Sequence, residues 1–482
     1  MTGRPDGGYA GYLSRAAARW PSRVGLRFEG QAWTYAALQA QTETAADRLA
    51  GAGITSGSRV ALLVDNCPEY LIAQFALARL GAVFVTPNPS WTAPEISRAL
   101  ITSGTTAAVH SDRLEEAAGL VDVAVPVHTL SDIATTRAES IAQSPQAPLY
   151  IPFSSGTTGL PKGVVHTEAS LCGAVDQLCR HLALSADDRV QIALPLCHIF
   201  GATMSAAAFS VGAETTLFRR FDLDASLRHI ISERVTVWPL AGAVAHRLAQ
   251  RDDLRAHDFM SLRFFMWGGS AVPAGLAESI TARTGVGFLC SYGMTEAMMV
   301  AFNPVDDPQN WQLDSPGYAT DGTELRLSAR GELEVRGPSV AVGYAGLDSP
   351  DFLADNWFRT GDLATIADDG RLRIVDRVKD MLKVSGFQVA PTEVEQALLD
   401  HPDVNEVAVV GRSDDRTGEA AVAFVVAKHT GLTRDQLHDW VSTRLASYKR
   451  PREYYFVDKL PRTSGGKVCR GDLRARAQLI NS

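Results

Sequence analysis

The sequence of 482 residues lacks several features that would restrict its fold or its location. Its six cysteines include no C-x-x-C pair, so the pattern favours reduced, buried thiols over a disulfide framework or a zinc site. No run of about 18 apolar residues occurs, so we expect no membrane-spanning helix. The first residues contain no apolar stretch of the kind found in secretory signals, and we therefore expect a cytoplasmic protein.

An excess of positive charge is also absent. The chain has 46 basic and 54 acidic residues, which give a formal net charge of -8. This balance argues against nucleic acid as a partner, and an anionic ligand would need local groups that overcome the global repulsion. The content of 46% hydrophobic and 21% charged residues is typical of a globular enzyme, and the length suits two or three domains.

Helical and strand patterns alternate along the first half of the chain. Apolar spacing predicts helices at 35–52 and 68–80, and buried strands at 59–64, 82–86, 235–238 and 262–267. This alternation predicts an α/β fold with parallel sheets covered by helices.

The pattern changes after about residue 322. Short strands at 323–327 and 331–336 predict a β-rich patch. The segment from Asp376 onward is long enough for a small α+β domain. In its first helix, the T-x-x-E spacing of Thr392 and Glu395 predicts a capping box.

The stretch SSGTTGLPKG at 154–163 combines hydroxyls, glycines and one lysine. It is not the usual P-loop, because Pro161 stands where that pattern needs glycine. Glycine allows successive N–H groups to converge on an anion, and Lys162 adds a full positive charge. Apolar residues on both sides argue against a free surface loop. We therefore expect this stretch to bind phosphate through Ser154, Ser155, Gly156, Thr157, Thr158, Gly159 and Lys162.

Three further motifs carry side chains suited to a nucleotide, although each one alone is more typical of an ordinary turn or loop. In SYGMTE at 291–296, the tyrosine ring can lie on a purine and Glu296 can hold Mg²⁺. In WFRTGD at 357–362, Asp362 can accept hydrogen bonds from ribose hydroxyls. In PRTSGGK at 461–467, Lys467 follows two glycines on an arm that can reach an active site.

Together and in this order, the motifs resemble those of the adenylate-forming superfamily, which includes acyl- and aryl-CoA synthetases, firefly luciferase and peptide-synthetase adenylation domains. The resemblance runs nearly end to end and includes LPLCHIFG at 194–201 and DRVKDMLKVSGFQVAPTEVE at 376–395, the latter most similar to 4-coumarate–CoA ligases and luciferases. It implies a large N-terminal domain, residues 1–378, of parallel-sheet αβα subdomains plus the β-rich patch. A small, mobile α+β C-terminal domain, residues 379–482, would follow.

The resemblance also implies an acid–thiol ligase that uses ATP, Mg²⁺ and CoA. A carboxylic acid is joined to the α-phosphorus of ATP with release of pyrophosphate, and the acyl group then passes to a thiol. The small domain turns about Lys379, which matches the family's hinge, and replaces Lys467 by a segment with Lys383, Ser385, Gly386 and Gln388. The catalytic residues implied are Lys467, His198, Thr295, Glu296, Lys383 and Gln388, and the remaining nucleotide-binding residues are Gly269, Ser270, Ser291, Tyr292, Gly293, Asp362 and Arg377.

The acyl pocket is less well defined. Amino-acid-activating relatives have an aspartate after the region that matches LPLCHIFG, and this chain has none there, so we expect a substrate without an α-ammonium group. His198 matches a position that flanks the pocket, and the other candidates suit an aryl or a short-to-medium aliphatic acid: Thr203, Trp238, Trp267, Ala271, Met294 and Met298. Both tryptophans are equally typical of a plain core.

The acceptor of the acyl group stays open at this stage. CoA is the expected thiol, and the alternatives are the phosphopantetheine of a carrier protein or a simple amine. A non-catalytic nucleotide-binding relative is a further alternative, against which the intact Lys162, Glu296, Asp362 and Lys467 argue.

Overall fold

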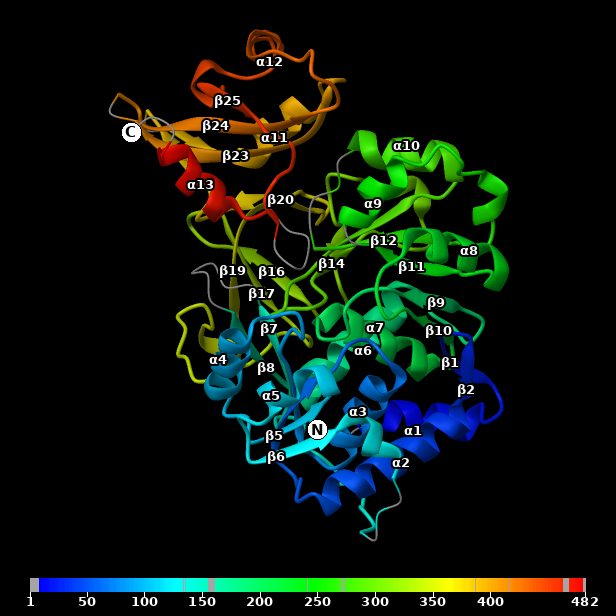
Figure 1. The fold of residues 1–482 in the computed structure, drawn as a ribbon. Helices are drawn as coiled ribbons and strands as arrows, with labels where there is room; N and C mark the ends of the chain where they lie inside the picture. The colour runs from blue at the N-terminus through cyan, green and yellow to red at the C-terminus, as the bar shows by residue number, and fades with distance from the viewer. Residues whose placement is uncertain are drawn as a thin grey trace.

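A computed structural model describes residues 8–132, 134, 136–154, 161–240, 242–269, 272, 274–385, 387–414, 416–462 and 468–479. These residues form four sheets with helices packed on them (Figure 1). The described helices include none long and apolar enough to cross a membrane. All six cysteine thiols are free, as the sequence predicts.

A seven-stranded sheet carries the first helices of the chain. Its order is β18-β8-β7-β4-β3-β5-β6. The strands from β7 to β6 are parallel, β8 pairs antiparallel with β7, and β18 pairs antiparallel with β8. The strands are β3 (Arg59–Leu63), β4 (Val83–Thr86), β5 (Ala107–His110), β6 (Val123–Pro126), β7 (Pro148–Ser154), β8 (Lys162–Thr167) and β18 (Gly343–Tyr344). The helices that follow its strands are α3 (Pro68–Arg79), α4 (Ala93–Ser103) and α5 (Glu115–Ala118).

A nine-stranded sheet has the order β15-β14-β13-β12-β11-β9-β10-β1-β2 and is parallel from β13 to β1. Its strands are β1 (Val24–Phe28), β2 (Gln31–Thr34), β9 (Arg189–Ile192), β10 (Glu214–Leu217), β11 (Val237–Leu240), β12 (Phe264–Trp267), β13 (Phe288–Tyr292), β14 (Ala301–Phe302) and β15 (Tyr318–Ala319). One face packs on α8 (Leu223–Glu233), α9 (Gly242–Ala249) and α10 (Ala274–Thr284). The main core lies on the other face and includes residues of α1 (Gly11–Arg19), α2 (Tyr35–Gly51), α3, α6 (Glu168–His181) and α7 (Ile199–Val211).

An antiparallel four-stranded sheet confirms the β-rich patch. It contains β16 (Glu324–Leu327), β17 (Glu332–Arg336), β19 (Phe358–Ile366) and β20 (Leu372–Arg377). Short 3₁₀ turns occur at Asp112–Leu114, Val127–Ser131, Ala256–Phe259, Pro308–Asn310, Ala354–Asn356 and Ser447–Lys449.

The C-terminal segment forms a lobe of its own at one end of the molecule, coloured orange to red in Figure 1. Its sheet contains β21 (Leu382–Val384), β22 (Phe387–Val389), β23 (Val404–Asp414), β24 (Gly418–Ala427) and β25 (Glu453–Phe456). Two core clusters of this lobe lie between the sheet and α11 (Pro391–Leu399), α12 (Arg434–Ser442) and α13 (Arg470–Leu479). The chain passes between sheets at 378–381, where the predicted domain boundary also lies.

The predicted capping box of α11 is wrong. The N-cap of α11 is Ala390, and no side chain caps it. The backbone N–H of Thr392 instead donates to Asp376 Oδ2 at 2.8 Å. The Glu395 carboxylate accepts from the Val409 N–H at 2.7 Å and pairs with Arg470 of α13. Contacts distant in sequence have therefore replaced the local pair.

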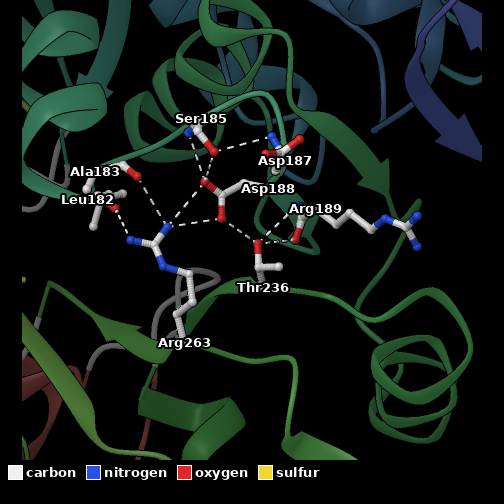
Figure 2. Close-up of polar contacts among 8 residues, drawn as sticks. All are labelled: Leu182, Ala183, Ser185, Asp187, Asp188, Arg189, Thr236 and Arg263. Carbon is white, nitrogen blue, oxygen red and sulfur yellow. Dashed lines mark hydrogen bonds and ion pairs between the residues drawn. The ribbon is translucent and has the colours of Figure 1, made fainter.

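A buried polar cluster joins the amino ends of three strands in the nine-stranded sheet (Figure 2). Asp188, which is only 4% exposed, accepts from the Arg263 guanidinium at 3.0 Å and from the Thr236 hydroxyl at 2.7 Å. The Arg263 guanidinium also donates to the carbonyl of Leu182, so these hydrogen bonds connect the loop after α6 to the starts of β9 and β12. Since these residues lie before their strands, the carboxyl ends of the same strands stay available for a ligand.

Candidate active site

The SYGMTE segment leaves the end of β13 and forms a tight turn. Met294 and Ala297 exchange backbone hydrogen bonds of 2.9 Å and 3.3 Å. A Cβ on Gly293 would lie 1.9 Å from the carbonyl oxygen of Met298, so only glycine fits at this position. The turn therefore holds Tyr292 and Glu296 at its two ends.

Tyr292 lies at the end that faces the four-stranded sheet. Its hydroxyl donates to Asp362 Oδ2 at 2.5 Å, and Arg377 Nε lies 3.0 Å from Asp362 Oδ1. Asp362 and Arg377 are opposite each other on β19 and β20, and Asp362 is only 4% exposed. Burial and the Asp362 carboxylate raise the pKa of Tyr292 well above its ordinary value, so its hydroxyl stays a donor. The structure thus brings together three residues predicted to bind the nucleoside.

Glu296 lies at the other end of the turn and is 8% exposed. Its Oε1 accepts a hydrogen bond of 3.0 Å from the hydroxyl of Tyr344 on β18. The Lys162 ammonium lies 4.7 Å from the centroid of the same Tyr344 ring. Burial and the neighbouring Glu296 carboxylate raise the pKa of Tyr344 above its ordinary value. Tyr344 therefore connects the predicted phosphate-binding lysine to the predicted metal ligand.

Thr295 is held through its backbone. Its carbonyl lies 2.8 Å from Nε2 of His166, and the other ring nitrogen of His166 lies 3.2 Å from the Ser170 hydroxyl. Because a carbonyl only accepts, Nε2 carries the hydrogen. His166 is fully buried, and burial lowers its pKa to about 4, so the ring is neutral near pH 7. His166 could have been noticed in the sequence, because it is a polar residue within the apolar strand pattern that follows the predicted phosphate-binding stretch. Tyr344 could not, because no spacing in the sequence links it to the motifs.

The stretch predicted to bind phosphate lies between two antiparallel strands. Ser154 ends β7 and lies opposite Lys162, the first residue of β8. Residues 155–160, and with them Ser155, Gly156, Thr157, Thr158 and Gly159, lie outside the described residues. Within the described residues the next element after β7 is the strand β8 and not a helix, so the positive charge predicted here is that of Lys162.

Gly269 and Ser291 lie close to the carboxyl ends of β12 and β13, which are parallel neighbours. Gly269 has a φ of +83°, which favours glycine, and the Ser291 hydroxyl donates to the Trp267 carbonyl at 3.0 Å. Ligands of open α/β sheets bind beyond these ends. Ser270 and Ala271, predicted beside them, lie outside the described residues.

The described residues predicted to line an acyl pocket belong to different core clusters or lie at their edges. Trp238 and Trp267 are each 1% exposed and pack in the core beneath α8, α9 and α10, whereas Met298 belongs to the core on the opposite face. The Thr203 hydroxyl donates to the Ile199 carbonyl of its own helix at 2.6 Å. Two further candidates lie at other places: Met294 packs against the core of the four-stranded sheet, and His198 is exposed at the N-cap of α7. Their roles in the pocket stay predictions.

The C-terminal lobe presents its predicted residues on a hairpin. Lys383 of β21 and Gln388 of β22 form a cross-strand pair, and both are exposed. Ser385 lies in the hairpin turn with a φ of +51°, and Gly386 lies outside the described residues. Lys379 lies between β20 and β21, and loss of hydration of its ammonium lowers its pKa from the ordinary value.

Lys467 lies outside the described residues, although both flanks of its arm are described. Arg462 and Val468 form an isolated β-bridge at the base of the arm, and Arg462 pairs with Glu406 at 2.5 Å. Both charges act on His246 of α9, whose pKa is lowered mainly by burial.

Comparison with known families supplies the deciding observation. The model of the AMP-binding enzymes matches residues 13–345, and the model of their C-terminal domain matches residues 393–467. The chain is a member of the AMP-binding enzyme family. The predicted superfamily is thereby confirmed.

Individual members of the AMP-binding family resemble the chain over nearly its whole length. Feruloyl-CoA synthase from Amycolatopsis sp is 34% identical over 488 residues, which cover 97% of this chain and 99% of that protein. 4-Coumarate–CoA ligase 2 from Oryza sativa subsp. japonica is 33% identical over 504 residues, covering 93% and 88%. ATP-bound MatB from Rhodopseudomonas palustris superposes with a TM-score of 0.92 at 26% identity, covering 98% and 100%. These likenesses confirm the α/β fold and the assignment as an acid–thiol ligase.

The donor groups of this AMP-binding enzyme fit a nucleotide with its magnesium ion. A buried carboxylate held by the Tyr292 hydroxyl and by its cross-strand neighbour Arg377 suits ribose hydroxyls, and the ammonium of Lys162 suits phosphate. Among the described residues no group of three or more His, Cys, Asp or Glu side chains forms a metal cage. A single carboxylate such as Glu296 is nevertheless what Mg²⁺ needs when phosphates and water supply its other ligands.

Proposed function

We propose that this enzyme activates an aryl carboxylic acid with ATP and Mg²⁺ to the acyl-adenylate, releases pyrophosphate, and transfers the acyl group to CoA. The observation that carries this proposal is the SYGMTE turn. Its Tyr292 end contacts Asp362, and its Glu296 end is connected through Tyr344 to Lys162. One rigid segment thus spans from groups suited to a nucleoside to groups suited to its phosphates.

Each group has a defined task in this proposal. Asp362, with Arg377 beside it, accepts the ribose hydroxyls. Lys162 and the N–H groups of the glycine-rich stretch bind the departing pyrophosphate, and Glu296 holds the Mg²⁺ that balances the phosphate charge. Lys467 binds the substrate carboxylate in the first half-reaction. Lys383 and Gln388 act in the second half-reaction after the C-terminal lobe has turned about Lys379.

An aryl acid is the substrate class that the relatives favour. The two relatives named above are a feruloyl-CoA synthase and a 4-coumarate–CoA ligase, and both names refer to aryl acids joined to CoA. The absence of an acidic residue in Phe200–Ala206 argues against an amino acid as substrate. CoA is the proposed acceptor because both relatives are named for CoA products, and a carrier protein or an amine is the competing acceptor.

The proposal is tested with a panel of aryl, aliphatic and amino acids. Each acid is incubated with enzyme, ATP and Mg²⁺, and hydroxylamine traps any activated acyl group. Parallel reactions contain CoA, a phosphopantetheine-bearing carrier protein or a simple amine, and mass spectrometry identifies the products. We expect a hydroxamate and a CoA thioester from an aryl acid.

Different outcomes would overturn different parts. A thioester on the carrier protein but none on CoA would replace the acceptor and leave the adenylation step in place. Preference for an aliphatic acid would replace the substrate class. A panel without any hydroxamate or thioester would contradict the catalytic assignment and favour a nucleotide-binding protein.

A further inference from the structure

We propose that Tyr344 is a positioning residue that fixes the Glu296 carboxylate for Mg²⁺ and the Lys162 ammonium for phosphate. This inference rests on the proposed function of the site. Tyr344 does not belong to any of the nucleotide-binding motifs of the sequence. It comes from β18, a two-residue strand that adds to the edge of β8.

The contacts of Tyr344 place it between two opposite charges. Its hydroxyl donates to Glu296 Oε1 at 3.0 Å, and its ring lies 4.7 Å from the Lys162 ammonium. Within the part of the chain that the structure describes, the Glu296 side chain accepts its hydrogen bond from this hydroxyl, and Lys162 forms no ion pair. The phenol therefore contacts a lysine and a glutamate of opposite charge that form no ion pair with each other in the described structure.

This arrangement leaves both charges available to a ligand. A hydrogen bond from the phenol stabilises the ionised carboxylate and fixes one of its oxygens, so the other can face a cation. The ring attracts the ammonium through its π-electrons without accepting its hydrogens, so the three N–H donors remain for phosphate. A direct Lys–Glu ion pair would have to be broken before MgATP could bind.

Backbone contacts hold Tyr344 in this position. Tyr344 pairs with Val164 in the β18–β8 ladder, and the Ala345 N–H donates to the Gly163 carbonyl at 2.8 Å. The Glu296 carbonyl accepts from the Ala341 N–H, also at 2.8 Å. The segment 341–345 therefore contacts both β8, which carries Lys162, and the SYGMTE turn, which carries Glu296. These contacts hold the two charged groups in place relative to each other.

The test compares ATP binding with and without Mg²⁺, measured by calorimetry on the full chain. Tyr344→Phe keeps the ring beneath Lys162 and removes only the hydroxyl. We expect the ratio by which Mg²⁺ strengthens ATP binding to fall by about tenfold, as for loss of a hydrogen bond to a charged group. Affinity for ATP without Mg²⁺ should change by less than about threefold, since the ring remains.

Two controls separate positioning from general damage. Tyr318 lies on β15, and its hydroxyl donates to Asp369 at 3.2 Å. Tyr318→Phe removes this similar hydroxyl and should leave the Mg²⁺ ratio unchanged. In a Glu296→Gln background, Tyr344→Phe should have no further effect on that ratio, because the two groups act through one contact.

The outcomes distinguish this inference from the proposed function. An unchanged Mg²⁺ ratio in Tyr344→Phe, even with a lower melting temperature, would overturn the positioning role. Equal additional losses in the Glu296→Gln background would also overturn it. Failure of the wild type to release pyrophosphate with any acid, with the Mg²⁺ effects as expected, would contradict the proposed reaction and support the positioning role.

Discussion

At the scale of single residues, Asp362 has the most strongly determined position in the site. It accepts from Tyr292 on one oxygen and from Arg377 on the other, and it is almost fully buried. Asp362→Asn keeps the shape but replaces an acceptor by a donor. We expect the Kd for ATP to rise about tenfold or more, since bonds to a charged acceptor are lost.

Calorimetry with ATP measures this effect directly. Asp369→Asn is the matched control, because Asp369 also accepts from a tyrosine hydroxyl but lies exposed near β20. It should bind ATP as the wild type does. Equal affinity of Asp362→Asn and the wild type for ATP would remove Asp362 from the nucleotide site.

His166 gives a prediction about pH. Its pKa is lowered from 6.5 to about 4 in the folded state by burial, so the unfolded chain binds more protons between these values. Stability is therefore complete above about pH 6.5 and is lost as the pH falls toward 4. The loss from this group amounts to about 3 kcal/mol.

Denaturant unfolding at a series of pH values tests this account of His166. His166→Gln keeps a donor for the Thr295 carbonyl and does not titrate in this range, so its stability should fall less between pH 6.5 and 4.5. His257→Gln, at an exposed site, should follow the wild type. A His166→Gln curve parallel to the wild type would show that the ring is not held neutral by burial.

At the scale of elements, the cluster around Asp188 holds the loop after α6 against the amino ends of the strands. Arg263→Ala would leave a buried carboxylate with only the Thr236 hydroxyl and local donors. We expect a loss of about 3 kcal/mol in the free energy of unfolding, since one partner of a buried pair is removed. ATP affinity should change little, because the cluster lies at the opposite ends of the strands from the site.

Urea unfolding measures this loss, with Arg219→Ala as the control for an exposed pair. Arg219 and Glu29 are each about half exposed, and such pairs contribute less than about 1 kcal/mol. Similar losses for the two variants would mean that the Asp188 cluster contributes no more than a surface ion pair.

Local patterns predicted the elements well where the interactions are local. The helix expected at 68–80 is α3, Pro68–Arg79, and the strand expected at 331–336 is β17, Glu332–Arg336. Periodicity reports these elements because adjacent residues determine them. The strand expected at 235–238 begins two residues later, at Val237, because its pairing with β12 sets the boundary.

Contacts between distant segments were not predictable in the same way. The spacing of Thr392 and Glu395 fits a capping box, yet Asp376 and Arg470 take their hydrogen-bonding groups. Tyr344 lies 48 residues from the glutamate it contacts, and no local pattern reports such a pair. The motifs predicted the nucleotide-binding residues, whereas the contact of Tyr344 with Glu296 became apparent only in the folded structure.

At the scale of the whole molecule, the proposed reaction requires the segment that carries Lys467 to reach the site. The base of the arm, at the bridge between Arg462 and Val468, lies in the C-terminal lobe. Lys467→Ala should abolish acid-dependent pyrophosphate release, a fall of about a hundredfold or more, because one electrostatic contact to the reacting groups is lost. ATP affinity should remain close to that of the wild type. Unchanged release would exclude this lysine from the first half-reaction.

The central claim is that the acid is activated on the α-phosphorus of ATP before any thiol takes part. Exchange of labelled pyrophosphate into ATP, measured with an accepted acid and without CoA, tests this claim most directly. The account predicts acid-dependent exchange in the absence of CoA, and AMP as the nucleotide product once CoA is added. Formation of ADP and phosphate, or exchange that needs CoA, would contradict it.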